Sequence, residues 1–298
     1  MENSTKTPIL YLERLQDNNI YIMRDDLLPF SFGGNKARKA VLFFREIEAQ
    51  GCDIVVTYGS GGSNHCRIIA NMAVSKGLGC HVISTDAESN CANRRMTQQF
   101  GAVVHSCPVE QVAATIDSVM ETLRQEGRKP YFIPGGGHGN IGTRAYDLAY
   151  EQILESGIDF DYIFLASGTG TTHAGLICGK KRLGPEKLKI VGISIARANP
   201  RGGQVVADSV KSYCGEDAGE DLIFEDGYLC GGYGKYDDAI DTTIRRMLHS
   251  HGLPLDPTYT GKAYCGMERY LAHHQIREKN ILFIHTGGTP LFYDWVMK

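Results

Sequence analysis

The stretch Tyr162-Ile-Phe-Leu-Ala-Ser-Gly-Thr-Gly-Thr-Thr-His-Ala-Gly175 joins three local patterns that together favour one class of fold. It begins with an apolar run of the length expected for a strand that is buried on both faces of a parallel sheet. Glycines and hydroxyl residues follow at Ser167–Thr172, and an apolar helix is expected over Thr171–Arg182. A strand that passes through a glycine turn into a helix is the repeating unit of α/β proteins.

The same order of strand, glycine turn and helix recurs along most of the 298 residues. Strands are expected at residues 20–23, 53–58, 81–84, 103–105, 131–133, 162–166, 190–195 and 281–285. Helices are expected at residues 36–50, 63–76, 93–100, 110–126, 143–155, 171–182, 237–251 and 263–273. The alternation predicts an α/β fold with right-handed crossovers. The segment 198–226 lacks periodicity and is expected to be irregular, either mobile or facing the substrate.

Composition and charge exclude several classes of function. The formal net charge is -3 and no long run of like charges occurs, so nucleic acid is not an expected partner. No apolar stretch reaches the roughly 18 residues of a membrane span, and no signal peptide is recognisable. The 9 cysteines contain no C-x-x-C pair, so neither a disulfide framework nor a metal site is expected. Reduced thiols indicate a cytoplasmic protein.

Lys36 is the candidate nucleophile, within the stretch Phe32-Gly-Gly-Asn-Lys-Ala-Arg-Lys39. The two glycines allow a tight turn and leave room for a flat ligand. Lys39 follows three residues later on the same helical face, and a second ammonium there favours the neutral, nucleophilic form of Lys36. The stretch fits a lysine that forms a Schiff base with pyridoxal phosphate, although a solvated lysine after a glycine turn is the commoner use of such a pattern.

Two glycine turns are candidate anion sites. Ser167–Thr172 opens an apolar helix, where backbone N–H groups, hydroxyls and the helix dipole favour a phosphate. No Lys-Ser or Lys-Thr follows these glycines, so the turn is not a Walker A loop. Ser63, Asn64 and His65 stand before another apolar helix and are suited to hold a carboxylate. An ordinary helix cap remains the alternative for both turns.

A different class of function is kept open by Gly137-His-Gly-Asn-Ile-Gly142, which fits the dinucleotide fingerprint of nicotinamide-dependent oxidoreductases. That fingerprint needs an acidic residue at the end of the next strand, whereas Asp161 stands at the start of that strand. Tyr233 and Tyr259 lie in or beside glycine turns, where a tyrosine can stack on a flat ring or relay protons, or simply pack.

Taken together, these motifs resemble the D-cysteine desulfhydrase / 1-aminocyclopropane-1-carboxylate (ACC) deaminase family of fold type II, tryptophan-synthase-β-like pyridoxal-phosphate enzymes. Residues 24–27, 33–39, 62–65, 167–170, 174–175, 259–262 and 285–288 carry the resemblance in family order. It implies two three-layer α/β/α lobes with open, mostly parallel twisted sheets and the cofactor in the cleft between them. Residues 1–40 with 150–298 would form the larger, cofactor-binding domain and residues 41–149 the smaller inserted domain. The enzyme would be a homodimer.

The resemblance also implies roles for individual residues. Lys36 would carry the cofactor and abstract the proton, with Ser63, Tyr233 and Tyr259 as further catalytic residues. Ser63, Asn64 and His65 would receive the substrate carboxylate. The residues expected to hold pyridoxal phosphate are Lys36, Asn64, Ser167, Gly168, Thr169, Gly170, Thr171, Thr172, Thr260 and Thr286.

Thr260 matches the position that faces the pyridine nitrogen of the cofactor in the family, and it separates two kinds of relative. ACC deaminases carry a glutamate there, which keeps the nitrogen protonated, whereas D-cysteine desulfhydrases carry a threonine. We therefore expect a lyase that acts on a small amino acid by α,β-elimination, turning D-cysteine into pyruvate, sulfide and ammonia.

Several alternatives stay open within and beyond this class. They are ACC deamination, elimination from cysteate or 2,3-diaminopropionate, amino-acid racemisation, and a protein that binds pyridoxal phosphate without catalysis. Segments 135–139 and 196–203 depart from the family pattern, and they are expected to shape the substrate pocket.

Overall fold

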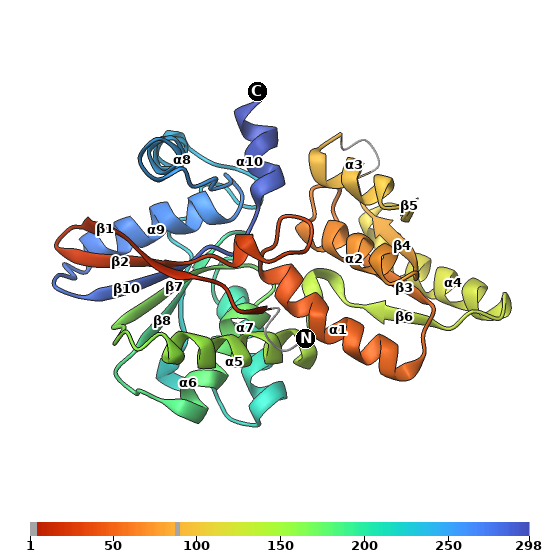
Figure 1. Cartoon of the computed structure of the whole chain (residues 1–298), viewed down its shortest axis with the longest axis horizontal. Helices are drawn as coiled ribbons and strands as arrows, with labels where there is room; N and C mark the ends of the chain where they lie inside the picture. Colours follow the sequence, from red (N-terminus) through yellow and green to blue (C-terminus); the bar gives the residue numbers. More distant parts are fainter. Residues whose placement is uncertain (1–4, 87–89, 298) are drawn as a thin grey trace.

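The computed structural model describes residues 5–86 and 90–297, which form two open sheets with helices around them (Figure 1). Sheet A has six strands in the order β1-β2-β10-β7-β8-β9, and sheet B has four in the order β5-β4-β3-β6. Within the described residues, every strand pair is parallel except β1 with β2. The expected α/β fold with open, mostly parallel sheets is confirmed.

The strands and helices follow the expected alternation closely. The strands are β1 (Ile9–Leu15), β2 (Asn18–Met23), β3 (Ile54–Gly59), β4 (Gly79–Ser84), β5 (Val103–Ser106), β6 (Pro130–Ile133), β7 (Tyr162–Ser167), β8 (Lys189–Ser194), β9 (Ile223–Glu225) and β10 (Asn280–Ile284). The helices are α1 (Asn35–Gln50), α2 (Asn64–Ser75), α3 (Ala92–Gln99), α4 (Val112–Gln125), α5 (Asn140–Glu155), α6 (Thr171–Leu183), α7 (Arg201–Cys214), α8 (Asp238–His251), α9 (Thr260–His273) and α10 (Thr289–Val296).

Sheet A is the middle of three layers. Figure 1 shows α8 and α9 on one side of it and α5 and α6 on the other. Successive side chains of a strand point to opposite faces, and both faces are apolar here. Phe164 of β7 packs in the core with α8 and α9, whereas its neighbours Ile163 and Leu165 pack in the core with α5 and α6. Burial on both faces explains why these strands read as continuous apolar runs.

Sheet B is built in the same way on a smaller scale. Val55 of β3 packs with α1 and α2, whereas Ile54 and Val56 pack with Met120 and Leu123 of α4. We propose that the two sheets are the centres of two lobes, residues 1–40 with 150–298 around sheet A and residues 41–149 around sheet B. Helix α5 packs against both α6 and α1, so it joins the layers of the two sheets.

The segment 198–226 is not irregular, which corrects the expectation from sequence. Helix α7 occupies about half of it, and β9 forms an edge of sheet A. Val206 and Val210 of α7 are buried at the spacing of a helical face. Gly202 and Gly203 hid this pattern because glycine is a poor helix former. Gly202 is needed at its position, since a Cβ atom there would lie 2.3 Å from the ring of Phe224.

Two further elements were missed, and two helices begin at other residues than expected. Strand β1 was missed because it lies at the edge of sheet A with half-exposed side chains, among them Leu10 and Tyr11. Helix α10 was missed because it is short and follows a glycine-rich turn. Helices α5 and α9 each begin three residues earlier than expected, at Asn140 and Thr260, because glycines in their first turns resembled loop residues.

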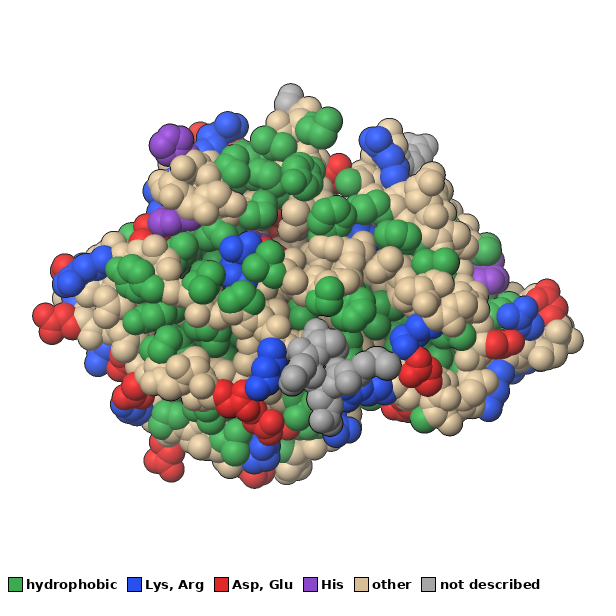
Figure 2. Space-filling view, viewed as in Figure 1, with side chains coloured by type: hydrophobic (Ala, Val, Ile, Leu, Met, Phe, Trp, Pro, Cys, Tyr) green, Lys and Arg blue, Asp and Glu red, His purple; other side chains and the backbone are tan. Residues whose placement is uncertain are grey.

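The surface carries charges of both signs side by side over the face shown in Figure 2. This mixture agrees with the small formal net charge of -3. Among the described residues, no helix combines the length and the apolar character that crossing a membrane requires. All nine cysteines lie within the described residues, and none of them forms a disulfide there.

Candidate active site

Lys36 stands in the first turn of α1, directly after a backbone turn that needs glycine. Gly34 has a φ of 97°, and a Cβ atom there would lie 2.7 Å from the carbonyl oxygen of Thr286. The absence of a side chain lets this turn press against the loop that follows β10, and the N–H of Asn35 donates to the same oxygen over 3.0 Å. Lys36 therefore meets the Thr286 loop, although the two are far apart in the sequence.

The amine of Lys36 is held in surroundings that favour its neutral form. Its Nζ donates to the carbonyl oxygen of Gly136 over 3.1 Å. Burial lowers the pKa of Lys36 from 10.5 to about 8. Burial first, and then the charge of Lys36, lower the pKa of Lys39 well below its ordinary value. A lysine with a pKa of about 8 offers a nucleophilic amine near neutral pH.

A cavity of about 660 Å³ collects most of the residues predicted from sequence. Those that line it are Lys36, Ser63, Asn64, His65, Ser167, Gly168, Thr169, Gly170, Thr172, Tyr233, Tyr259 and Thr286. Thr171 and Thr260 are completely buried and do not line it. The loops that follow β2, β3, β6, β7, β8 and β10 meet here, because the carboxyl ends of parallel strands open at one edge of a sheet.

The turn between β7 and α6 has the features of a phosphate cup. Gly170 has a φ of 90°, and α6 begins at the next residue with its free N–H groups. The hydroxyl of Ser167 is buried and has no hydrogen-bond partner among the described residues. Lys39 donates to the hydroxyl of Thr171 over 2.6 Å. The cup thus combines a helix N-terminus, a nearby lysine amine and a buried hydroxyl without a partner among the described residues, which together fit a phosphate.

The same cup is tied to the lysine turn and to the loop after β6. The side-chain amide of Asn35 donates to the hydroxyl of Thr172 over 3.1 Å. A Cβ atom on Gly136 would lie 2.8 Å from Cγ2 of Thr169 and 3.5 Å from Nζ of Lys36. Only glycine leaves the space between Lys36 and the cup free for a ligand that reaches both.

Ser63 and His65 at the start of α2 have defined hydrogen-bond roles. Ser63 is the N-cap, and its Oγ accepts from the N–H of Cys66 over 3.3 Å, which leaves the hydroxyl hydrogen available. Thr57 donates its hydroxyl hydrogen to the carbonyl oxygen of Ile133, so it accepts a hydrogen bond from Nε2 of His65 over 2.8 Å. Burial, followed by the charges of the two lysines, lowers the pKa of His65. His65 is therefore neutral, and its Nε2 carries the hydrogen that the ring donates to Thr57.

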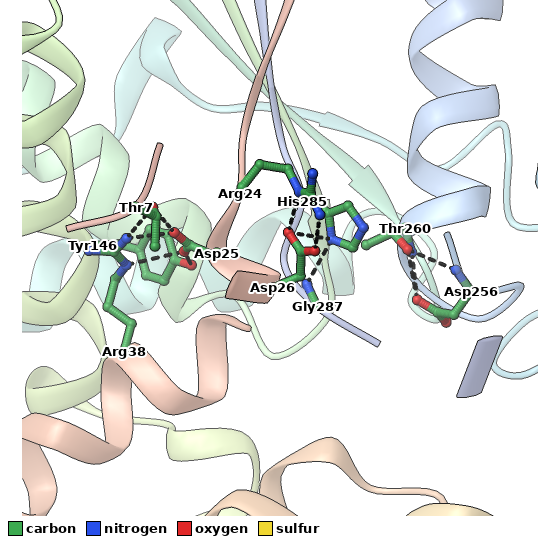
Figure 3. Close-up of polar contacts among 10 residues, drawn as sticks. All are labelled: Thr7, Arg24, Asp25, Asp26, Arg38, Tyr146, Asp256, Thr260, His285 and Gly287. Atoms are coloured by element: carbon green, nitrogen blue, oxygen red, sulfur yellow. Dashed lines mark hydrogen bonds and ion pairs between the residues drawn. The ribbon is translucent and has the colours of Figure 1, made fainter. Parts of the chain in front are cut away.

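Two tyrosines, Tyr233 and Tyr259, complete the opposite wall, and a buried carboxylate, Asp256, lies behind it. The hydroxyls of Tyr233 and Tyr259 lie 2.8 Å apart. Burial, and then the neighbouring Tyr233, raise the pKa of Tyr259 well above its ordinary value, so it remains a proton donor. Thr260 donates its hydroxyl to Oδ2 of Asp256 over 2.8 Å and accepts from the N–H of Asp256 over 2.9 Å (Figure 3). Asp256 caps α9 and is fully buried.

Two buried ionic clusters support the lysine turn (Figure 3). Arg38 of α1 forms an ion pair with Asp25 over 2.5 Å, and Tyr146 donates to the same carboxylate. In the second cluster, Arg24 forms an ion pair with Asp26 over 2.7 Å, and Asp26 lies 3.7 Å from Nδ1 of His285. Buried pairs of this kind are weak evidence for stability, but losing one partner is strongly destabilising. They hold the residues before Lys36 against α5 and β10.

The structure also brings to the cavity three residues that were not predicted as site residues: His138, Arg197 and Arg201. Arg197 donates to the carbonyl oxygen of Gly168 in the cup. Burial, together with the charges of Lys39, Arg197 and Lys36, lowers the pKa of His138. The available signal was that segments 135–139 and 196–203 depart from the family pattern. No carboxylate occurs among the described residues that line the cavity, so the cavity favours anionic ligands.

Comparison with known proteins agrees with this chemistry. A sequence model of the family "Pyridoxal-phosphate dependent enzyme" matches residues 2–287. The chain is 32% identical to D-cysteine desulfhydrase of Klebsiella pneumoniae subsp. pneumoniae, covering 97% of this chain and 93% of that protein. It is 32% identical, with the same coverage, to D-cysteine desulfhydrase of Salmonella typhi.

Solved structures show the same likeness in three dimensions. A crystal structure described as an ACC deaminase homologue has a TM-score of 0.90 and 32% identity, and it covers 98% of this chain and 93% of its own. A hydrogen sulfide-producing enzyme from Fusobacterium nucleatum has a TM-score of 0.66 at 17% identity, covering 96% of this chain and 94% of its own, and shares the fold.

Proposed function

Because this chain belongs to the family of pyridoxal-phosphate-dependent enzymes, we propose that it is a deaminating lyase that converts D-cysteine and water into pyruvate, hydrogen sulfide and ammonia. The observation that carries the proposal is the position of the Lys36 amine, which lies in one cavity with the phosphate cup. Burial lowers the pKa of this amine to about 8, and the described residues that line the cavity include no carboxylate. D-cysteine is named first because relatives with 32% identity are D-cysteine desulfhydrases.

The residues present fit pyridoxal phosphate. Its phosphate would be held by Ser167–Thr172 and the N-terminus of α6, where the unpartnered hydroxyl of Ser167 gains an acceptor. Lys36 would bond to the carbonyl carbon of the cofactor. When bound, the cofactor supplies an electron sink for the carbon that carries the substrate amino group.

The start of α2 is suited to hold the substrate carboxylate. The hydroxyl hydrogen of Ser63 is available to a ligand, and Asn64 lines the cavity. The ring of His65 is bonded to Thr57, so His65 would contribute its main-chain N–H group rather than its ring. Holding the carboxylate fixes the substrate so that one face of its α-carbon meets Lys36.

Proton transfer would be shared between Lys36 and the two tyrosines. Lys36, which is partly neutral near pH 7, would remove the proton from the α-carbon of the substrate. Tyr259 stays protonated because its pKa is raised, so it would give a proton to the departing sulfur. Tyr233 is 47% exposed and touches Tyr259, which supports its role as the link to solvent.

The test is a spectrum followed by a substrate survey. The purified protein loaded with pyridoxal phosphate is expected to show a visible absorbance band that Lys36→Ala abolishes. Pyruvate and sulfide are then measured with D-cysteine, L-cysteine, ACC, cysteate and 2,3-diaminopropionate. The absence of a lysine-dependent band would refute the cofactor assignment. A band with pyruvate from another substrate and no sulfide from D-cysteine would refute only the choice of substrate.

We also propose a cytoplasmic homodimer. The lack of disulfides among the cysteines of the described residues supports a reducing compartment. The dimer rests on the family resemblance and is tested by light scattering of the loaded protein at several concentrations.

A further inference from the structure

Arg67 is a completely buried arginine in the first turn of α2, beside the cavity wall. Its side chain is 0% exposed. Within residues 5–86 and 90–297 it has no ion-pair partner, and its Nε and Nη2 atoms have no hydrogen-bond partner. Burying a charge without a counter-charge is costly. A cation near a helix N-terminus also opposes the helix dipole. Arg67 is thus placed where folding alone gives it no advantage.

The contacts that Arg67 does make lead to Asn64. Its Nη1 donates to Oδ1 of Asn64 over 2.8 Å and to Oδ1 of Asn93 over 2.5 Å. Asn93, which is also completely buried, donates its Nδ2 to Oδ1 of Asn64 over 3.0 Å and to the carbonyl oxygen of Gly62 over 2.8 Å. Arg67 and Asn93 therefore meet on one oxygen atom of a residue that lines the cavity.

Hydrogen-bond chemistry determines how the Asn64 amide is turned. A guanidinium only donates and a main-chain carbonyl only accepts, so the oxygens of Asn64 and Asn93 must face Arg67, and the nitrogen of Asn93 must face Gly62. The oxygen of Asn64 is occupied twice on the protein side. Its NH₂ group is left as the donor available to the cavity, and the positive charge behind the oxygen polarises that donor.

We propose that Arg67 and Asn93 are positioning residues, which hold the Asn64 amide as a donor and supply the positive charge that makes this end of α2 selective for an amino-acid carboxylate. The inference rests on the proposed function, since it assumes an amino-acid ligand in this cavity. Burial lowers the pKa of Arg67 to about 9, and no anion among the described residues opposes the shift. The missing counter-charge is then provided by the ligand.

The test compares two ligands that differ only in the carboxylate: D-alanine and ethylamine. Each is titrated into the loaded protein, and the perturbation of the visible band gives a dissociation constant without turnover. In Arg67→Met the affinity for D-alanine is expected to fall about tenfold, because a charge-supported hydrogen bond is lost. The affinity for ethylamine is expected to stay unchanged. A purely structural role would weaken both ligands alike or neither, and either result overturns the proposal.

Three further variants serve as controls for the effect of Arg67→Met. Arg95→Met, an exposed arginine on α3, is the matched control and leaves both ligands unaffected. Asn93→Ser removes the second donor to Asn64, together with the acceptor for Arg67 and the hydrogen bond to Gly62. It is expected to weaken D-alanine binding about threefold and to leave ethylamine binding unchanged, so it tests the proposal if Arg67→Met does not fold. Glu88, outside the described residues, is tested as Glu88→Gln. A change in D-alanine affinity there would mean that the chain itself balances Arg67, which refutes the proposal.

The same titrations distinguish a failure of the proposed function from a failure of the role proposed for Arg67 and Asn93. A wild-type protein without the visible band fails the proposed function, and the positioning role falls with it. A wild-type protein that shows the band and prefers D-alanine over ethylamine supports the proposed function. If Arg67→Met keeps that preference, only the role of Arg67 is refuted.

Discussion

Replacing Lys36 with methionine should remove a pH dependence from the stability of the cofactor-free protein. Burial lowers the pKa of Lys36 from 10.5 to about 8 in the folded chain. A tenfold change in proton affinity corresponds to about 1.4 kcal/mol. Keeping Lys36 protonated in the fold below both pKa values therefore costs about 3 kcal/mol. Methionine has a similar length and carries no charge, so it avoids this cost at every pH.

The sign follows from the proton balance. Between the folded pKa of about 8 and the unfolded pKa of 10.5, the unfolded chain binds more protons at this residue than the folded chain. Stability must then rise with pH across that window. The gain is about 2 kcal/mol between about pH 8 and about pH 10. Lys39 acts in the same direction, because burial first, and then the charge of Lys36, lower the pKa of Lys39.

Urea unfolding of the cofactor-free protein at several pH values measures this effect. The wild type and Lys36→Met share all other titrating groups, so the difference between their free energies of unfolding reports Lys36 together with its electrostatic coupling to Lys39. Lys211→Met, at an exposed lysine, is the control and should keep the wild-type slope. Equal slopes in the wild type and Lys36→Met would show that Lys36 has an ordinary pKa, and the argument for a neutral amine near pH 7 would fail.

Three more substitutions test the cavity. Gly136→Ala should destabilise the cofactor-free protein by about 1–2 kcal/mol, because its φ is 71° and the added Cβ atom would lie 2.8 Å from Cγ2 of Thr169; unchanged urea unfolding and unchanged cofactor loading would contradict the need for glycine beside the phosphate cup. Asp256→Asn should cost about 1–3 kcal/mol, since the carboxylate accepts from both the N–H and the hydroxyl of Thr260; a thermal melt within error of the wild type would count against it. Tyr233→Phe should lower turnover about tenfold or more, with stability within about 0.5 kcal/mol of the wild type because the side chain is 47% exposed; full pyruvate production would exclude a proton relay through Tyr233.

Much of the fold follows from local patterns. Strands such as β7 could be located because both of their faces are buried, which makes the apolar run continuous. The exceptions have local causes as well. Helix α7 begins with Gly202 and Gly203, and β1 is a half-exposed edge strand. Both elements owe their form to packing partners that are distant in the chain, so periodicity alone does not reveal them.

The chemistry of individual residues divides in a similar way. The sequence was enough to name Lys36, the cup at Ser167–Thr172 and the cap at Ser63, because glycine turns and helix starts can be recognised from short stretches of residues. The sequence could not predict that Thr260 lies against a buried carboxylate at Asp256, or that Arg197 reaches the cup. These contacts depend on which loops meet at the edges of the two sheets.

The amino-acid sequence by itself therefore determined the fold class, the family and the lysine that would carry the cofactor, since each depends on residue types at short spacings. The tertiary structure alone decided how those residues behave. Burial in the folded chain lowers the pKa of Lys36 and keeps His65 neutral, and the fold places the His65 ring in a hydrogen bond with Thr57. It also places Arg67, which has no ion-pair partner in the described part of the chain, behind Asn64. Burial and charge balance are properties of the assembled chain, because they depend on what surrounds a group on every side.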